Sequence, residues 1–237
     1  MKEKIESIVQ YWDGQPGPLG TSPRLTLVWE KSLGQPSISF ANEMGWILAS
    51  HYVSKDEILL RNSQIDLGYK IYMLEINFAQ ENIASCISSS FNKEVSYKSV
   101  EDKHRMDFDV PLALCFGYED KNSNIIRKGI SWLYSDSYRL PIEKIVNGIN
   151  PKYSQIYEAF RNAPSSGNSQ TWRIVQVKDV AHFYVTSQLH ERYFNIGCAL
   201  AAFREAVRIE NINGSWLASK AYPKNMNEYV LSWSFNS

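Results

Sequence analysis

Residues Arg161–Trp172 read Arg-Asn-Ala-Pro-Ser-Ser-Gly-Asn-Ser-Gln-Thr-Trp, and this stretch separates two segments with opposite patterns. Before it, Pro151–Arg161 carries apolar side chains at helical spacing, and after it Trp172–Val177 alternates as a strand does. The intervening run of proline, serine, glycine and asparagine cannot continue a helix or fill a core. A polar loop held between a helix and a buried strand suits a ligand site, although an ordinary helix-to-strand connection would show the same pattern.

The chemistry of this loop indicates what kind of ligand it suits. Between Pro164 and Gln170 the chain offers backbone amides, hydroxyls and carboxamides. These groups can donate and accept hydrogen bonds around a flat, polar molecule.

The bulk composition bounds the fold and the partners. The chain has 237 residues, 44% of them hydrophobic, which is enough for one large domain or two small ones with a real core. Lysine plus arginine equals aspartate plus glutamate at 25 each, so nothing favours a nucleic-acid partner. No apolar run approaches the roughly 20 residues of a membrane span. Because Met1–Gln10 also lacks the apolar centre of a secretory signal, we expect a cytoplasmic protein.

Cysteine and histidine usage argues against metal or disulfide chemistry. The four histidines are scattered without metal-ligand spacing, and we expect no metal site. No Ser/His/Asp set, P-loop or paired carboxylate motif is present, so no catalytic side chain is assigned. The cysteines stand in apolar contexts and are predicted to be buried thiols in a reducing compartment: Cys86, Cys115 and Cys198.

Hydrophobic periodicity predicts the elements of the first half of the chain. Gln35–Val53 and Glu119–Tyr138 are interpreted as connections, Lys93–Asp109 as a loop with a short helix, and Ala84–Phe91 as a small polar segment. The predicted helices and strands are a helix at Lys2–Trp12, a strand at Arg24–Trp29, a helix at Ile65–Ala84 and a strand at Val110–Tyr118.

The second half repeats this plan at an offset of 129 residues. The predicted helix Asn195–Glu210 has an apolar stripe that matches the stripe of the first helix position by position. Identical flanking residues at the same offset indicate a true internal repeat, with two apolar stripes that we expect to pack against each other. The matched positions are Leu67, Ile71, Leu74 and Phe78 with Ile196, Leu200, Phe203 and Val207, Gly68 with Gly197, and Glu81–Ile83 with Glu210–Ile212.

The two copies differ in the loop before their first strand. Gly17–Gly20 in the first copy corresponds to Ala163–Ser166 in the second, but it lacks the serine and asparagine groups. We therefore expect one ligand per chain rather than two.

The loop of the second copy resembles the flavin-contacting loop of the nitroreductase family. The family pattern runs Ala-Pro-Ser-Ser/Ala-x-Asn-x-Gln-Pro-Trp, and Thr171 stands here where the family usually has proline. The resemblance implies that the loop contacts a flavin through Pro164, Ser165, Ser166, Asn168 and Gln170.

The repeat resembles a tandem branch of that family, in which one chain carries both halves of a homodimer. This resemblance implies an α+β fold of helix-flanked antiparallel sheets, with residues 1–138 and 139–237 as two half-repeats that form a pseudo-dimer. The chain is then expected to be a monomer or a weak homodimer.

In the family the flavin lies between two subunits, and the resemblance implies the same for the two copies here. The first copy would supply Ser88, Ser89 and Ser90, which match the family's Cys-Pro-Ile-Glu-Gly-Phe segment. It would also supply Arg139, which matches the family's Arg-Leu-Pro-Leu-Glu segment and, by the resemblance, contacts the flavin phosphate. Two plainer interpretations stay open: the serines form a loop or helix cap, and Arg139 is a solvated residue that starts a helix.

The implied function is FMN-dependent reduction of nitro or quinone-like compounds, with NAD(P)H as co-substrate. Such an enzyme needs few catalytic side chains because the flavin carries the hydride. The alternatives are a nitroreductase-like protein that binds flavin or another small ligand without turnover, and a structural remnant.

Overall fold

The computed structural model describes residues 1–29, 33, 43–101, 107–117, 138–186, 188–219, 221–224 and 227–236. The chain divides into two compact units, Met1–Lys128 and Gly129–Ser237, each of which combines helices with one sheet. The predicted connection at 119–138 lies outside the described residues, apart from Tyr138.

The helices of the first unit lie at the predicted positions, but the long helix is shifted toward the N-terminus and ends at Gln80 rather than Ala84. The long helix α2 begins at Glu57 rather than Ile65, because the Asp56 carboxylate caps it by accepting hydrogen bonds from two backbone amides of the first turn. The helices are α1 (Lys2–Asp13), α2 (Glu57–Gln80) and α3 (Lys93–Glu101).

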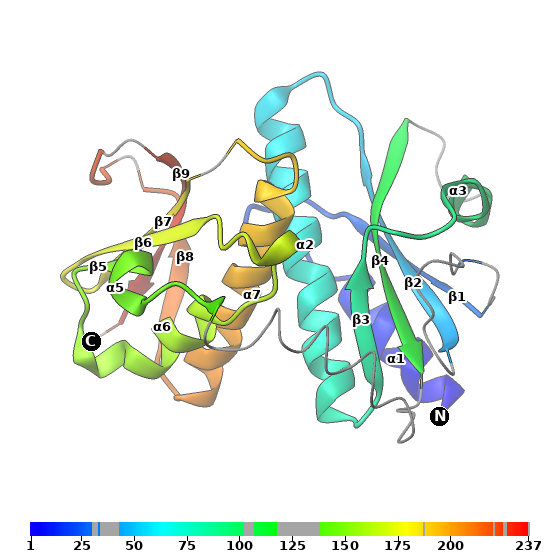
Figure 1. Ribbon diagram of the computed structural model, residues 1–237, viewed down its shortest axis with the longest axis horizontal. Helices are drawn as coiled ribbons and strands as arrows, with labels where there is room; N and C mark the ends of the chain where they lie inside the picture. Colours follow the sequence, from blue (N-terminus) through cyan, green and yellow to red (C-terminus); the bar gives the residue numbers. More distant parts are fainter. Residues whose placement is uncertain are drawn as a thin grey trace. The chain divides into compact units, whose positions relative to one another are not determined.

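The sheet of the first unit is antiparallel, in the order β1-β2-β4-β3 (Figure 1). The interpretation of Gln35–Val53 as a connection is wrong, because this range contains the strand β2. Residues Trp46–Ala49 of that strand are fully buried between β1 and β4, so no alternation of apolar and polar residues marks it. The strands are β1 (Arg24–Val28), β2 (Glu43–Tyr52), β3 (Ala84–Ser88) and β4 (Phe108–Gly117).

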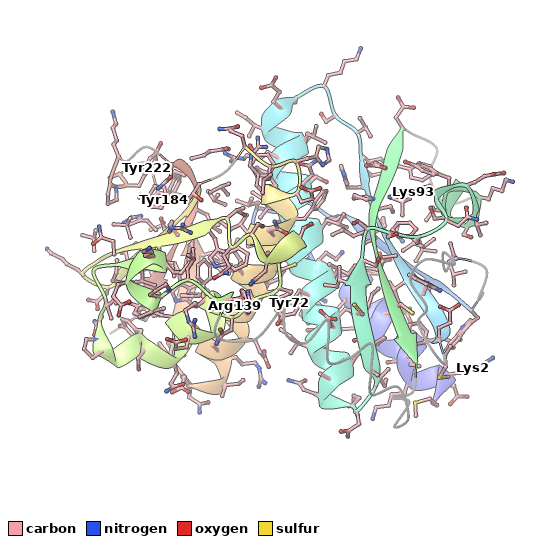
Figure 2. The ribbon with its side chains drawn as sticks, viewed as in Figure 1. Lys2, Tyr72, Lys93, Arg139, Tyr184 and Tyr222 are labelled. Atoms are coloured by element: carbon pink, nitrogen blue, oxygen red, sulfur yellow. The ribbon has the colours of Figure 1, made fainter. Side chains whose placement is uncertain are left out.

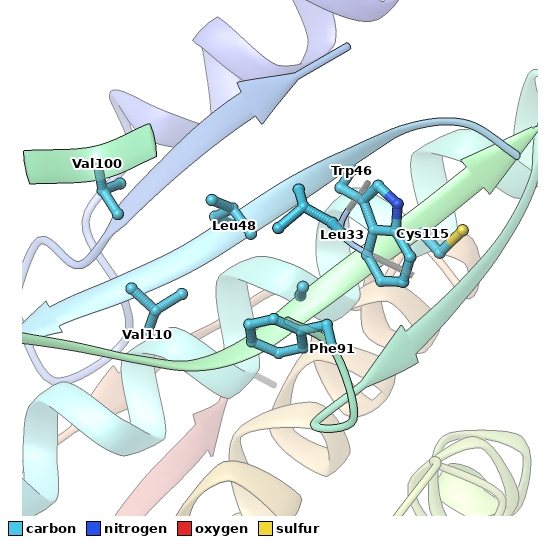
Figure 3. Packing of buried hydrophobic residues seen from close by; sticks show 8 residues of the cluster. Leu33, Trp46, Leu48, Phe91, Val100, Val110 and Cys115 are labelled. Atoms are coloured by element: carbon cyan, nitrogen blue, oxygen red, sulfur yellow. The ribbon is translucent and has the colours of Figure 1, made fainter. Parts of the chain in front are cut away.

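Both faces of this sheet are packed. On one face Phe78 of α2 meets Phe116 of β4 edge to face, at 5.5 Å between ring centroids. On the other face a second cluster surrounds Trp46, as Figure 3 shows. Its buried members are Leu33, Trp46, Leu48, Phe91, Val100, Val110, Ala113 and Cys115.

The second unit has a five-stranded sheet in the order β5-β6-β7-β9-β8, in which only the short β5 pairs in parallel. Strand β6 has the predicted bounds, and β9 begins one residue before the strand Tyr229–Phe235 that the repeat predicts, whereas the hairpin partner β7 and the edge strand β8 were not predicted. The strands are β5 (Val146–Asn147), β6 (Trp172–Val177), β7 (Val180–Val185), β8 (Gly214–Leu217) and β9 (Glu228–Phe235).

Both predicted helices of the second unit are present, and a further short helix was not predicted. The predicted helix at Pro151–Arg161 consists of a 3-10 turn (Pro151–Tyr153) that continues into α6 (Ser154–Arg161). The other helices are α5 (Ile142–Ile145) and α7 (Arg192–Ile209).

The apolar stripes of the long helices cover the sheets of their own units. Phe203 of α7 meets Phe183 of β7 at 4.9 Å and Trp233 of β9 at 5.9 Å between ring centroids. Phe78 of α2 likewise meets its own sheet. These aromatic members of the two stripes are therefore buried within their own units, as expected of an amphipathic helix beside a sheet. That the two stripes pack against each other stays a prediction.

Within each unit the same elements follow one another. A short helix precedes a hairpin, and a long helix then leads into an edge strand that pairs with the last strand. After each long helix an asparagine takes a left-handed backbone conformation, Asn82 with φ 57° and Asn211 with φ 53°. The strand orders β1-β2-β4-β3 and β6-β7-β9-β8 correspond one to one.

Two further findings concern the predicted chemistry. Cys115 and Cys198 are buried free thiols, but Cys86 is exposed, because it lies on β3 at the edge of its sheet. Among the described residues, no helix is long and apolar enough to cross a membrane, and no group of three or more potential ligands could hold a metal ion.

Candidate ligand site

The loop between α6 and β6 has a strained backbone. Ser166–Asn168 form one 3-10 turn, in which Gly167 has φ 57° and Asn168 has φ 54°. Gln170 follows with φ 45°. Left-handed conformations cost a non-glycine residue roughly 1–2 kcal/mol, and such strain is concentrated at functional sites.

Two of the predicted contact residues hold the loop from inside. The Ser165 hydroxyl accepts a hydrogen bond from the Gln170 amide at 3.1 Å. The Gln170 carboxamide accepts from the Leu140 amide at 2.8 Å and donates to the Tyr138 carbonyl at 3.2 Å. Because both side chains are buried and engaged in this way, they fix the shape of the loop.

The other predicted residues form the outer side of the loop. Ser166 and Gly167 are exposed, while Pro164 and Asn168 are partly exposed. The Asn168 carboxamide donates to the Tyr138 carbonyl at 3.2 Å, and a methyl group added at Gly167 would meet no atom within 4 Å. A ligand at this loop would therefore meet Ser166, Gly167 and Asn168 first.

Arg139 lies beside this loop, in the second unit rather than in the first copy as expected (Figure 2). Its guanidinium donates to the carbonyls of Ala163 at 2.8 Å and Asn162 at 3.1 Å. These carbonyls follow the last turn of α6, where no helical amide reaches them. Arg139 thus connects the chain before α5 to the start of the loop.

Ser88–Ser90 lie in the first unit, at the end of β3. The Ser88 hydroxyl accepts from the Ser90 amide at 3.0 Å and donates to the Ser90 carbonyl at 3.2 Å. These bonds form a small turn that agrees with the plainer interpretation of this segment. Contact between these serines and a ligand stays a prediction.

Sequence reasoning missed Asn195, which lies under the loop near the start of α7. Its carboxamide oxygen accepts from the Ser166 amide at 3.1 Å, and its nitrogen donates to the Ser169 hydroxyl at 3.2 Å. The side chain is 5% exposed. The repeat offset could have found it, because Asn195 follows Asp66 by 129 residues and stands two residues before the matched Gly197.

Asp66 occupies the corresponding place in the first unit. Its carboxylate accepts from the amides of Leu19 at 2.9 Å and Thr21 at 2.8 Å, and from the Thr21 hydroxyl at 2.6 Å. A methyl group added at Gly17 would lie 2.1 Å from the Asp66 Cγ. The carboxylate therefore fills the inside of the loop, and only glycine leaves room for it.

Lys70, one turn further along α2, completes this arrangement. Its ammonium donates to the carbonyls of Asp13 at 3.0 Å and Pro23 at 2.5 Å, at the two ends of the loop. Burial lowers the pKa of Lys70 to about 8, although Asp13 and Asp66 raise it again in part. Asp13 in turn is paired with Arg24. The corresponding residue in the second unit is Ala199, which carries no charge.

Two polar atoms at the start of β6 are buried without a hydrogen-bond partner among the described residues. They are the Thr171 hydroxyl and the Trp172 indole nitrogen. Thr171 stands where the nitroreductase pattern has proline. A proline side chain has no hydroxyl group, so it would leave no such atom without a partner.

Helix-flanked antiparallel sheets of this order define a mixed helix-and-sheet protein with a nitroreductase-like fold. A family model described as "Putative TM nitroreductase" matches residues 26–206, and the chain belongs to this family. The match includes most of the loop's supports, among them Arg139 and Asn195.

Two solved structures are similar to the chain, and the first of them supports this fold. A "putative nitroreductase" from Thermotoga maritima has a TM-score of 0.60 and 16% identity, over 99% of this chain and 84% of its own. A nitroreductase family protein from Clostridium difficile has a TM-score of 0.42 and 19% identity, over 63% of this chain and 87% of its own. No curated protein matches the chain.

Proposed function

We propose that the protein is an FMN-dependent oxidoreductase that reduces nitro or quinone-like compounds with NAD(P)H. Membership of the nitroreductase family supports oxidoreductase chemistry. The observation that carries the proposal is the loop before β6, whose buried polar residues hold Ser166, Gly167 and Asn168 outward in a strained turn.

The groups on this turn fit a flavin ring. The polar edge of the ring alternates hydrogen-bond donors and acceptors, and the Asn168 carboxamide can both donate and accept. The open space at Gly167 would let a flat ring approach the backbone closely. The Ser166 hydroxyl adds a further donor or acceptor.

These contacts indicate separate roles for the bound flavin and for the protein residues. A bound flavin would supply the hydride chemistry. The protein's own residues would hold and orient the ring: Ser166 and Asn168 by hydrogen bonds, and Ser165 and Gln170 by fixing the loop. Arg139 supports the same loop at Asn162 and Ala163.

We further propose that the two units are half-repeats of a pseudo-dimer and that one FMN binds per chain. The matching order of elements within each unit supports the repeat. The first-unit loop holds a carboxylate where a ligand-binding loop would present its amides, which supports a single site.

The test is a spectroscopic titration with FMN followed by anaerobic reduction. We expect the flavin fluorescence to be quenched at one equivalent per chain and the yellow absorption to be bleached by NAD(P)H and restored by a quinone. Asn168→Ala should weaken binding about tenfold, whereas Ser22→Ala, at an exposed position of the first-unit loop, should not. Quenching without bleaching would identify a flavin-binding protein without turnover, and no quenching at all would exclude the flavin function.

A further inference from the structure

A single buried carboxamide holds both ends of the outward turn. Asn195 accepts from the Ser166 amide at one end and donates to the Ser169 hydroxyl at the other. Between these two contacts stand Gly167 and Asn168, the two consecutive left-handed residues. The residues that would meet a ligand are thus connected to α7 on both sides.

The strain of the turn makes such a connection necessary. Gly167 adopts the left-handed conformation without steric cost, but for Asn168 and Gln170 it is unfavourable in an isolated chain, so a loop without support would relax into other conformations. A ligand that recognises only the strained form then binds more weakly, in proportion to the fraction of molecules that still hold it.

A carboxamide suits this task for a chemical reason. One of its atoms accepts from a backbone amide while the other donates to a hydroxyl. A carboxylate could replace it, because the serine hydroxyl can rotate and donate instead. A leucine side chain has nearly the same shape but could do neither.

We propose that Asn195 is the positioning residue of the ligand loop: it acts through Ser166 and Ser169 to hold Gly167 and Asn168 in the binding conformation. This inference rests on the proposed function only for the identity of the ligand, which is a flavin. Asn195 itself lies beneath the loop and touches no substrate.

Asp66, the residue of the first unit that corresponds to Asn195, binds its loop in a different way. Asp66 draws in the amides of Leu19 and Thr21 and the Thr21 hydroxyl, so that three polar groups of the loop point toward the helix. Asn195 takes one amide and one hydroxyl. The first unit thus has a carboxylate and a loop whose polar groups point toward the helix. The second unit has a carboxamide at the same position and a loop whose turn points outward.

The experiment compares Asn195→Leu and Asn195→Asp with the parent protein, with Asp66→Asn as the matched control in the first unit. The first readout is amide hydrogen exchange at Ser166 and Thr21, measured without any ligand. The second is the affinity for FMN and for riboflavin, from fluorescence quenching.

We expect Asn195→Leu to speed exchange at Ser166 on the order of tenfold and to weaken both flavins by a similar factor. In Asn195→Asp, the exchange rate at Ser166 and the flavin affinity should both stay within about threefold of the parent values, because a carboxylate can still form the two hydrogen bonds. Asp66→Asn should change exchange at Thr21 but neither exchange at Ser166 nor flavin affinity. Unchanged exchange and affinity in Asn195→Leu would overturn the proposal.

Two further outcomes are also decisive. If the parent protein binds no flavin, the proposed function fails, but hydrogen exchange at Ser166 still tests the positioning role. If Asn195→Leu does not fold, Ser169→Ala replaces it, since this change removes one of the two bonds from a partly exposed loop. Ser169→Ala should then speed exchange at Ser166 about threefold, and exchange equal to that of the parent would overturn the proposal.

Discussion

The loop before β1 in the first unit and the loop before β6 in the second unit begin alike and end differently. Each follows a short helix and receives a polar side chain from the long helix, Asp66 in the first unit and Asn195 in the second. The first loop turns its amides and a hydroxyl inward to a buried carboxylate. The second keeps its turn outward and strained. The two loops therefore differ together with the residue that the long helix supplies. The loop beside Asp66 is filled by the carboxylate, and the loop beside Asn195 keeps a turn that can contact a ligand.

The ends of the short helices show that different residues can do the same work. In the first unit Lys70 donates to the carbonyl of Asp13, the last residue of α1. In the second unit Arg139 donates to the carbonyls of Asn162 and Ala163 after α6. Carbonyls at a helix C-terminus need such donors, because no helical amide follows them. The cation comes from the long helix in one unit and from the segment before α5 in the other.

The largest expected effect is that of Gly17→Ala in the first-unit loop. The new methyl group would lie within 2.4 Å of three Asp66 atoms and would force the buried carboxylate out of its three hydrogen bonds. At about 1 kcal/mol per hydrogen bond, the free energy of unfolding should fall by about 3 kcal/mol in urea denaturation. Gly20→Ala is the matched control: its φ of 81° is strained but its surroundings are open, so it should cost only about 1 kcal/mol. Equal losses for the two variants would show that Asp66 does not fill the loop.

The second effect is the contribution of Lys70 to the pH dependence of stability. Its pKa is about 8 in the folded protein and 10.5 as a free side chain, so the unfolded chain binds more protons between these values. Stability should therefore rise by about 2–3 kcal/mol between pH 8 and pH 10.5 from this group. The charged groups that face it are Asp13, Arg24 and Asp66. The rise is measured as the difference between the parent and Lys70→Met, which should lack it, and parallel pH profiles would contradict the burial of this amine.

The third effect decides what Arg139 does in the second-unit loop. Because its guanidinium is bound to two loop carbonyls, Arg139→Ala should loosen the loop and weaken FMN and riboflavin by the same factor, about tenfold or 1.4 kcal/mol. Paired fluorescence titrations with the two flavins make the comparison. A loss confined to FMN would instead assign Arg139 to the phosphate, as the family resemblance implies.

The smallest effect is that of Gly167→Ala on the outward turn. No atom would meet the new methyl group within 4 Å, so only the left-handed backbone, with φ 57°, opposes it. The free energy of unfolding should fall by about 1 kcal/mol. A loss as large as that of Gly17→Ala would mean that the second loop is also packed from inside.

The features predictable from the sequence were those with a local signal. The helical stripe of Leu67, Ile71, Leu74 and Phe78 is fully buried in α2, and the strand Trp172–Val177 has the predicted bounds. The strand β2 gave no such signal, because a strand buried on both faces does not alternate. The exposed position of Cys86 also depends on which strand lies at the sheet edge, which is a property of the pairing.

The candidate site was predictable in composition but not in geometry. The loop Pro164–Gln170 could be recognised from its residues, since turn formers and polar groups are visible in the chain. Which of them point outward could not, because Ser165 is turned inward by the Gln170 amide, and Gln170 by hydrogen bonds to Tyr138 and Leu140, which are distant in sequence. Asn195 could not be recognised for the same reason. The role of a polar residue in a helix depends on its hydrogen-bond partners, and these are known only from the structure.

The most direct test of the difference between the two loops is the number of flavins bound per chain. Isothermal titration of the parent protein with FMN should give one site, which Asn168→Ala weakens about tenfold and Ser22→Ala leaves unchanged. Two equivalent sites, or one site that responds to Ser22→Ala and not to Asn168→Ala, would contradict the assignment of the ligand to the outward loop of the second unit.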